Sequence, residues 1–225
     1  MKNIDHWAIN RTSLDADSVG GRSSVARPLS EKKHPTHPIG GKNHEIRLIG
    51  GMWKRTKLKV VDKPGLRPTP DRVRETLFNW LGQDLTGLRC VDVFAGTGAL
   101  GFEAASRGAR EVRLVESDKT LVAQLDLMKA QLKADAVTVI RGDGLHALAA
   151  LAAASVDVIF LDPPFDSKLF EPALLAAGSV VAADGFVYLE APKKWSDEQL
   201  VPFKLSLHRH AKAGAVHAHL LTPIN

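Results

Sequence analysis

The sequence has little of several residue types on which other classes of protein depend. Its single cysteine, Cys90, cannot form a disulfide within the chain, and it stands in an apolar run that predicts a buried, unreactive thiol. No apolar run approaches the roughly 20 residues that a membrane-spanning helix needs. The first residues also lack the apolar stretch of a secretory signal. These absences argue against a secreted or membrane-spanning protein and predict a cytoplasmic one.

Support for a metal site is also weak. Four histidines near the C-terminus alternate along the chain, so that each pair shares one face of a strand, which is a possible geometry for metal binding. No cysteine or carboxylate cluster accompanies them, and we predict no metal site. The four are His208, His210, His217 and His219.

Positive charge is concentrated in the N-terminal third of the chain. Residues 1–74 carry 16 Lys and Arg against 7 Asp and Glu, whereas residues 75–225 carry 14 against 18. A basic part attached to a mildly acidic one predicts a polyanionic partner that binds mainly to the N-terminal part. The alternative is a solvated basic face.

The N-terminal part divides further by composition. Residues 1–44 are rich in Gly, Ser, Pro, Lys and His and have few large apolar side chains, so they are predicted to form a disordered tail. Residues 45–84 predict a basic unit, with two short strands around a Gly-Gly turn within residues 45–61 and then a helix. In that helix Thr69 is the expected N-cap and Pro70 the first helical residue.

Residues 85–225 alternate between apolar runs and helix-length segments rich in Ala and Leu. Such alternation predicts a Rossmann-like α/β fold, in which helices cover both faces of a parallel sheet. Residues 204–221 form two alternating stretches around Lys-Ala-Gly and predict an antiparallel strand pair at the end of the sheet. The apolar runs predicted as strands are residues 90–94, 112–116, 137–140, 156–161 and 186–190.

A glycine-rich loop follows the first of these strands. In VDVFAGTGALGFEA, Gly96, Gly98 and Gly101 have the spacing that lets a ligand approach the backbone at the start of a helix. This pattern alone also fits nicotinamide and flavin enzymes. Asp92, just before the loop, would repel the pyrophosphate of a dinucleotide but attract the sulfonium and ammonium groups of S-adenosylmethionine. The loop therefore favours S-adenosylmethionine, with a turn or capping role as the alternative for Asp92.

Two further acids follow the next two strands. Glu116 comes 20 residues after Gly96, where an acid can accept hydrogen bonds from both ribose hydroxyls of an adenosine. Asp143 follows the third strand and is placed to accept from the adenine amino group. Each acid alone could be a helix N-cap. Three acids at successive strand ends, after a glycine loop, predict one cofactor site at the carboxyl edge of the sheet.

The fourth strand runs into Asp162-Pro163-Pro164-Phe165. The prolines fix the backbone and remove two N–H donors, so the Asp162 carboxylate and the Pro163 carbonyl remain as acceptors. They can hold the two N–H groups of an amine on an aromatic ring and orient its nitrogen, while Phe165 stacks on the base. The pattern predicts methylation of such an amine without a metal. The alternative is a rigid loop that ends the strand.

Together these motifs resemble a known family. RLIGGMWKRTKL, GLRPTPDRVRETLFNWL, VDVFAGTGALG, VESD and DPPF are similar to the motifs of RsmD-type 16S rRNA guanine-N2 methyltransferases, and the resemblance covers residues 46–222. It implies the class I methyltransferase fold, a Rossmann-like seven-stranded sheet that is mostly parallel with an antiparallel C-terminal pair. It also implies S-adenosyl-L-methionine as cofactor and a monomer that methylates guanine N2 (guanine 966 in the family) in 16S rRNA, within a partly assembled small ribosomal subunit.

The resemblance also implies roles for individual residues. The target amine would be held by Asp162, Pro163, Pro164 and Phe165. The cofactor would be bound by Asp92, Phe94, Ala95, Gly96, Thr97, Gly98, Glu116, Ser117, Asp143 and Gly144.

A basic strip precedes the cofactor loop. Residues 46–74 hold nine Lys and Arg against two acids, a balance that suits contact with RNA phosphates. Arg72 and Arg74 are expected on the outside of the helix. Trp53 or Trp80 could stack on a base, although core packing is the expected role of Trp80. The residues predicted to bind RNA are Arg47, Lys54, Arg55, Lys57, Arg67, Arg72 and Arg74.

Two alternatives stay open. A DNA adenine or protein glutamine N-methyltransferase would use the same Asp-Pro-Pro-Phe chemistry, and a non-catalytic RNA-binding assembly factor would keep the scaffold without the reaction. The basic hairpin and the RPTPDRVRETLF block favour the rRNA methyltransferase over the first alternative. The intact glycines, acids and DPPF count against the second.

Overall fold

A computed structural model describes residues 44–61, 63 and 69–224. The tail predicted for residues 1–44 lies outside these residues except for His44, and so does Arg67. None of the helices within the described residues combines the length and apolar character that crossing a membrane requires. The strands are β1 (His44–Arg47), β2 (Lys57–Val60), β3 (Arg89–Asp92), β4 (Glu111–Glu116), β5 (Val137–Arg141), β6 (Val156–Leu161), β7 (Val181–Ala191), β8 (Leu205–Ala213) and β9 (Val216–Pro223). The helices are α1 (Asp71–Leu81), α2 (Ala99–Ser106), α3 (Lys119–Leu132), α4 (Gly144–Ala149), α5 (Phe170–Val180) and α6 (Asp197–Leu200), with a 3₁₀ helix at Val201–Phe203.

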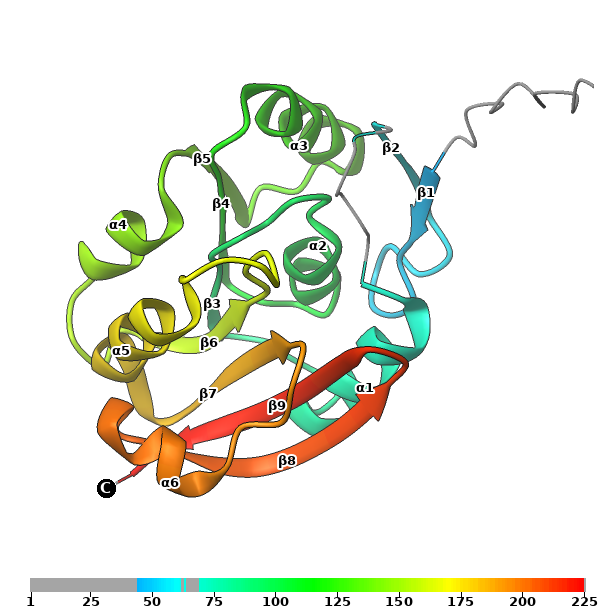
Figure 1. Cartoon of the computed structure of the whole chain (residues 1–225). Coiled ribbons are helices and arrows are strands. Elements are labelled where there is room, and N and C mark those ends of the chain that lie inside the picture. The colour runs from blue at the N-terminus through cyan, green and yellow to red at the C-terminus, as the bar shows by residue number, and fades with distance from the viewer. Residues whose placement is uncertain (1–43, 62, 64–68, 225) are drawn as a thin grey trace, which may run out of the picture. The chain divides into compact units, whose positions relative to one another are not determined.

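Seven of the described strands form one sheet in the order β5-β4-β3-β6-β7-β9-β8, and β1 and β2 form a small sheet of their own (Figure 1). In the large sheet β3 pairs in parallel with β4 and β6, β4 with β5, and β6 with β7. β9 pairs antiparallel with both β7 and β8. The predicted Rossmann-like sheet with its antiparallel C-terminal pair is therefore confirmed. The carboxyl ends of β3 to β6 lie at one edge, where open α/β sheets bind ligands.

Helices cover both faces of the large sheet, which explains why its strands are apolar throughout. α1, α2 and α3 pack on one face and α4 and α5 on the other, as Figure 1 shows. Side chains alternate between the faces, so that Cys90 joins the first apolar cluster and Val91 the second. Burial raises the pKa of the Cys90 thiol to about 12. The thiol is therefore protonated and unreactive, as predicted.

The small sheet has a longer connection than the sequence suggests. β1 and β2 pair antiparallel, and residues 48–56 join them in place of the predicted tight Gly-Gly turn. Gly51 packs against the end of α2 with a φ of 70°, and a Cβ there would come within 1.8 Å of the Ser106 carbonyl oxygen. Met52 N donates a hydrogen bond to that same oxygen at 2.7 Å. The glycine thus serves the close approach of the loop to α2 rather than a hairpin turn.

A buried ion cluster fastens this loop and α1 to α2. Glu103 of α2 is fully buried, and its carboxylate accepts hydrogen bonds from Ile49 N at 2.9 Å and Gly50 N at 2.7 Å. The guanidinium groups of Arg74 and Arg107 pair with it at 3.4 and 2.9 Å. Arg74 also pairs with Asp71 at the surface, at 2.5 Å, so that each buried charge of this cluster has at least one partner of opposite sign, as a buried ion requires.

Two predictions for α1 are wrong. Arg74 does not face solvent, because it lies one turn before Phe78 on the apolar face of the helix and is only 1% exposed. Thr69 does not cap the helix, because Pro70 takes the N-cap position. The buried Thr69 side chain forms a hydrogen bond with Glu190 instead, and its carbonyl accepts one from Arg74 Nε at 3.2 Å.

Candidate active site

The carboxyl edge of the parallel strands collects the acids that the sequence singled out. Asp92 and Glu116 are the last residues of β3 and β4, and Asp162 directly follows β6. Asp143 lies just beyond the end of β5. Because β3 lies between β4 and β6, the acids from three neighbouring strands converge beside the glycine loop.

The glycine loop is a rigid turn. Ala95 N donates to the Val115 carbonyl at 2.9 Å, which ties the loop to β4. Gly98 then takes a left-handed conformation with a φ of 75° directly before α2. A Cβ at Gly98 would lie 2.6 Å from the Leu125 side chain, so only glycine fits here.

Glu116 braces this turn from the neighbouring strand. Its Oε2 accepts a hydrogen bond from Gly96 N at 2.9 Å, and its Oε1 accepts one from Asp118 N at 2.8 Å. The side chain is half-buried. The Ser117 hydroxyl lies 3.4 Å from Oε1, whereas Oε2 has a second lone pair, so Glu116 is still able to accept a hydrogen bond from a hydroxyl of a bound ribose.

Asp92 lies beneath the turn and is 2% exposed. Its Oδ2 accepts a hydrogen bond from Gly101 N at 3.1 Å, so the carboxyl group braces the start of α2. Burial raises the pKa of Asp92 to about 7, the Gly101 N–H opposes this effect, and the charges of Glu116 and Glu190 add to it. Asp92 therefore has the turn or capping role that the sequence offered as its alternative. In its ionised form, its negative charge also lies directly below the glycines.

The remaining predicted cofactor residues surround this turn. Asp143 is the N-cap of α4, where its side chain accepts a hydrogen bond from His146 N at 2.7 Å, which is the alternative role that the sequence left open for it. Of the others, Ala95, Thr97, Gly98 and Gly144 are buried, Phe94 and Gly96 are half-buried, and Ser117 is exposed.

The Asp162-Pro163-Pro164-Phe165 turn follows β6 at the same edge. Ser167 closes the turn, because its backbone N and its Oγ both donate to the Pro164 carbonyl, at 3.0 and 2.6 Å. Among the described residues no hydrogen bond uses the Pro163 carbonyl. Phe165 is 36% exposed. One carbonyl and one carboxyl group are therefore available for a ligand, beside an exposed aromatic ring.

Three residues of this site were not predicted. Glu190 of β7 is 3% exposed, and the Tyr188 hydroxyl donates to its Oε1 at 3.0 Å. Thr69 also hydrogen-bonds its carboxyl group. A sequence signal was present, because an acid ends the apolar run 186–190 just as Glu116 ends the run 112–116.

Acids dominate the electrostatics of the edge. Burial raises the pKa of Asp162 well above its usual range, and the nearby charges of Glu190 and Asp92 raise it further. Burial also raises the pKa of Glu190, although hydrogen bonds from Tyr188 and Thr69 oppose the rise. Among the described residues no lysine or arginine forms an ion pair with Asp92, Asp162 or Glu190. The edge suits a cation or a set of N–H donors.

The basic strip lies mostly on the surface. Five of the residues predicted to contact RNA are exposed: Arg47, Lys54, Arg55, Lys57 and Arg72. Two of them form surface ion pairs, Arg47 with Asp71 at 3.1 Å and Lys57 with Glu45 at 3.0 Å, and such pairs contribute only about 0–1 kcal/mol. Trp53 and Trp80 are both partly buried against the first apolar cluster. Arg74 is excluded from this surface by its burial.

The C-terminal histidines have local partners. His219 is fully buried, accepts a hydrogen bond from Trp195 N at 3.1 Å, and contacts the Leu189 carbonyl through Nδ1 at 3.2 Å. Burial lowers its pKa to about 4. His210 Nε2 and His217 Nδ1 are 3.0 Å apart and share a hydrogen bond. Both ring nitrogens of His219 are therefore engaged within the fold.

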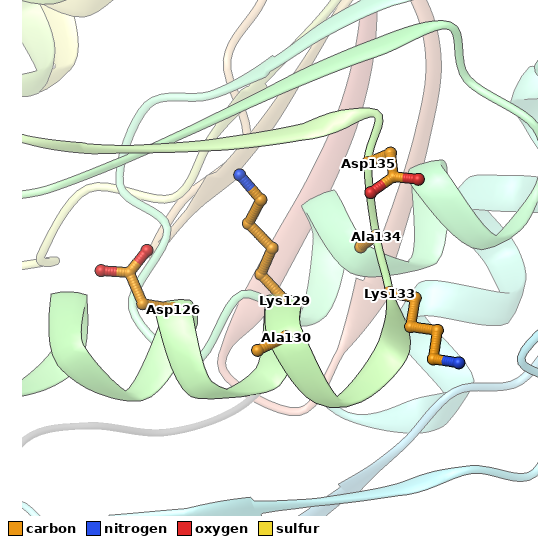
Figure 2. A pocket seen from close by; sticks show the side chains of 6 residues that line it. All are labelled: Asp126, Lys129, Ala130, Lys133, Ala134 and Asp135. Atoms are coloured by element: carbon orange, nitrogen blue, oxygen red, sulfur yellow. The ribbon is translucent and has the colours of Figure 1, made fainter.

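Two surface hollows lie outside this edge. The larger, of about 430 Å³, lies at the end of α3 and is lined by Asp126, Lys129, Ala130, Lys133, Ala134 and Asp135, none of which was predicted as a site residue (Figure 2). The smaller, of about 90 Å³, separates α1 from the β8-β9 hairpin. Ala218, Arg72 and Lys212 are among the residues that line it, and Ala218 pairs with Glu190 across the strands.

Comparison with known proteins identifies the family to which this chain is similar. A family described as "Conserved hypothetical protein 95" matches residues 46–222. Ribosomal RNA small subunit methyltransferase D of Escherichia coli K12 is 42% identical over 186 residues, which are 82% of this chain and 91% of that protein. A putative rRNA methyltransferase of Bacillus subtilis is 35% identical over 153 residues, 64% of this chain and 82% of that protein.

Solved structures agree with the sequence relatives. A putative methyltransferase from Escherichia coli superposes with a TM-score of 0.69 at 40% identity, covering 80% of this chain and 98% of its own. A putative methylase from Haemophilus influenzae gives a TM-score of 0.67 at 33% identity, covering 81% and 100%. These relatives agree with the glycine loop, the acids at the strand ends and the DPPF turn. The chain belongs to the RsmD-type family of ribosomal RNA small subunit methyltransferases.

Proposed function

We propose that this protein transfers a methyl group to the exocyclic N2 amine of a guanine in 16S rRNA. Membership of a class I methyltransferase family implies S-adenosyl-L-methionine as the methyl donor. The observation that carries the proposal is the DPPF turn, whose acid and free carbonyl lie at the same sheet edge as the glycine loop. An enzyme that joins a methyl donor to a ring amine needs these two sites side by side.

The cofactor residues fit a positively charged donor. S-adenosyl-L-methionine supplies a methyl group activated by a sulfonium, so the donor carries positive charge where a dinucleotide carries negative charge. Beneath the loop lies the buried Asp92, which has no basic partner among the described residues, and Glu116 retains acceptor capacity for a ribose. We therefore assign donor binding to the loop Phe94–Gly98, to Glu116 and Ser117, and to Asp143 and Gly144, with Asp92 beneath the loop.

The target amine would be held by the turn after β6. The Asp162 carboxylate and the Pro163 carbonyl each accept one N–H of the amine, which directs the nitrogen lone pair toward the methyl group. Phe165, which is partly exposed, offers a flat face on which the base stacks. Such an amine is a weak nucleophile because its lone pair is delocalised into the ring, so two acceptors and a fixed orientation supply much of the help it needs.

RNA binding is assigned to the exposed basic residues of the small sheet, its loop and α1. Phosphate contacts from Lys54, Arg55 and Arg72 would supply affinity with little reading of sequence. The target base must leave its stack to enter the site, which favours exposed nucleotides of a partly assembled small subunit. We accordingly propose that residues 45–84 form the RNA-facing unit, that residues 85–225 form the methyltransferase domain, and that the protein acts as a monomer.

The test is the modification state of ribosomal RNA in cells that lack this gene. Nucleosides from digested 16S rRNA are quantified by mass spectrometry in the deletion strain, the parent, and the deletion strain carrying the gene. Loss of one N2-methylguanosine per 16S molecule, and its return with the gene, is the expected result. Loss of a methylated adenosine instead, or of a methylglutamine from protein, would reassign the substrate, and an unchanged profile with impaired assembly would indicate a non-catalytic assembly factor.

A further inference from the structure

Glu190 is a buried acid that the proposed reaction leaves without a role. It is 3% exposed at the carboxyl end of β7, the strand next to the one that carries the DPPF turn. A buried carboxyl group without a basic partner costs folding free energy, so its presence at the site calls for a physical reason.

The strand register places Glu190 beside Asp162. Phe160 of β6 lies opposite Tyr188 of β7, and their rings contact each other with centroids 6.5 Å apart. The paired register ends with Leu161 opposite Leu189, and Asp162 and Glu190 are the next residues of the two segments. Because side chains alternate with a period of two and neighbouring strands lie about 4.8 Å apart, the two carboxyl groups share one face as direct neighbours.

Glu190 is held in place by hydroxyl donors. Tyr188 donates to its Oε1 at 3.0 Å, and Thr69, from the segment before α1, contributes a second hydrogen bond. Hydrogen bonds donated to a carboxylate favour its charged form. These two donors oppose the rise in the pKa of Glu190 that burial causes, and they stabilise the charged form of the group next to Asp162.

Asp162 is consequently surrounded by acids and hydroxyls. Asp92 faces it from β3, and Glu190 and Tyr188 face it from β7. Thr69 approaches the same cluster from the segment before α1. Among the described residues no lysine or arginine forms an ion pair with any of the three acids, so nothing in the cluster offsets the repulsion.

We propose that Glu190 is a positioning residue that acts through Asp162, making the Asp162 carboxylate the acceptor of the proton that leaves the target nitrogen. This inference rests on the proposed methylation of a ring amine at Asp162. Neither the cofactor nor the base needs to touch Glu190.

The proton balance shows why such an acceptor is needed. The nitrogen lone pair forms the new N–C bond while the S–C bond of the donor breaks and its electron pair stays on sulfur. The nitrogen then carries a methyl group, two protons and a positive charge. One N–H proton passes to the Asp162 carboxylate while the electron pair of that bond returns to nitrogen, and the proton later leaves to solvent. A neighbouring negative charge makes Asp162 a stronger base for this transfer.

The test uses Glu190→Gln, which keeps the shape and an acceptor for the Tyr188 hydroxyl but removes the charge. Single-turnover methylation of small-subunit RNA is followed from pH 5 to 9 in the wild type and the variant. Asp162 must be ionised to accept a proton, so the rate rises with pH through the pKa of Asp162. The expected result is a midpoint of this acidic limb about one pH unit lower in Glu190→Gln, with a lower rate on the alkaline plateau. A lower rate with an unmoved midpoint would mean a purely structural role and would overturn the proposal.

Two further variants separate charge from packing. Tyr188→Phe removes one donor to Glu190, weakens the preference for its charged form, and should lower the midpoint by a smaller amount. Glu171→Gln removes an exposed acid on α5 and should leave both rate and midpoint unchanged. An equal shift in Glu171→Gln would trace the effect to net charge and would count against the proposal.

A second measurement does not depend on turnover. Carboxyl carbons of Asp162 and Glu190 are followed by NMR during pH titration of the protein without ligands. Glu190→Gln should move the titration of Asp162 to lower pH by about one unit, and an unmoved titration would refute the influence of Glu190. If the wild type fails to methylate RNA at any pH while this titration shifts, the proposed function fails and the coupling between the two acids stands.

Discussion

Two groups of acids in this fold have opposite surroundings. Glu103 on α2 has two arginines and two backbone N–H groups around its carboxylate. The acids at the carboxyl edge, Asp92, Asp162 and Glu190, have hydroxyl or backbone donors but no basic partner among the described residues. A compensated acid holds elements together, whereas an uncompensated acid costs stability and remains available for a positively charged ligand or for N–H donors.

The compensated site joins the loop of the small sheet and α1 to α2. Glu103 binds the loop of the small sheet through Ile49 and Gly50, and it binds α1 through Arg74. The Thr69 carbonyl accepts from Arg74, and the Thr69 side chain reaches Glu190. A continuous set of polar contacts therefore leads from the basic loop to the acid edge. Thr69 is the residue through which these contacts reach Glu190.

The largest expected effect comes from breaking the compensated site. Glu103→Gln removes the carboxylate that pairs with Arg107 and leaves Arg74 with the half-exposed Asp71 alone, and loss of one partner from a buried ion pair costs about 3–5 kcal/mol. Urea unfolding should show this loss of stability, and the amides of Ile49 and Gly50 should exchange faster with solvent. Glu171→Gln, at an exposed position on α5, is the matched control and should unfold like the wild type. A loss below about 1 kcal/mol in Glu103→Gln would erase the distinction between the two sites.

A smaller effect sharpens the description of the uncompensated site. The pKa of Asp92 is about 7, raised mainly by burial, so Asp92 is protonated below neutral pH in the free protein. A bound sulfonium favours the ionised form, so binding of S-adenosylmethionine should release a proton and tighten as the pH rises toward 7, then level off. The neutral-sulfur product S-adenosylhomocysteine should show less of this dependence. Calorimetry should give a ratio of the two affinities that changes by up to about tenfold per pH unit.

Asp92→Asn provides the control for that measurement. The asparagine side chain can still accept the hydrogen bond from Gly101 N, while its charge no longer depends on pH. The affinity ratio of the two ligands should then become flat between about pH 5 and 7. A ratio that still rises with pH in the variant would place the responsible acid elsewhere.

The smallest effect concerns basic residues in two environments. Lys54, Arg55 and Lys57 are exposed, whereas Arg74 and Arg107 are buried in the Glu103 cluster. Neutralising the three exposed residues should weaken RNA binding several-fold and leave the stability of the protein unchanged. The slope of log affinity against log salt concentration should become shallower by about 0.7 for each phosphate contact that is lost. Lys129→Ala with Lys133→Ala, at the α3 hollow of Figure 2, removes charge from a remote surface and serves as control. Equal decreases in RNA affinity in both variants would contradict the proposal that the small sheet and its loop contact the RNA.

Local patterns in the sequence predicted the sheet and one half of the site. The apolar runs, the glycine loop and the acids at strand ends are each readable within about 15 residues, because strand period and turn chemistry are local properties. Asp162 and Phe165 were predicted as site residues for the same reason. The C-terminal strand pair likewise follows from alternation around a single glycine.

The rest depends on contacts between distant segments. Arg74 was expected outside because it is charged, although its position one turn before Phe78 places it on the apolar face. Its burial depends on polar partners that include Glu103 on another helix and the Arg47 carbonyl on β1. Thr69 matched a helix cap in type, but its hydroxyl reaches Glu190 on β7. Glu190 can be recognised as a site residue only from the strand order, which places β7 next to β6 and Glu190 near Asp162. Sequence period alone carries no information on which strands become neighbours.

The most direct test of the account is single-turnover methyl transfer by Asp162→Ala. Small ribosomal particles from cells lacking the gene serve as substrate, a labelled methyl donor reports transfer, and calorimetry measures donor affinity in parallel. If the Asp162 carboxylate holds the target amine, the rate of methyl transfer should be at least about 100-fold lower in the variant, with donor affinity within several-fold of the wild type. Formation of N2-methylguanosine at close to the wild-type rate would contradict the assignment of Asp162 as the acid that holds the amine.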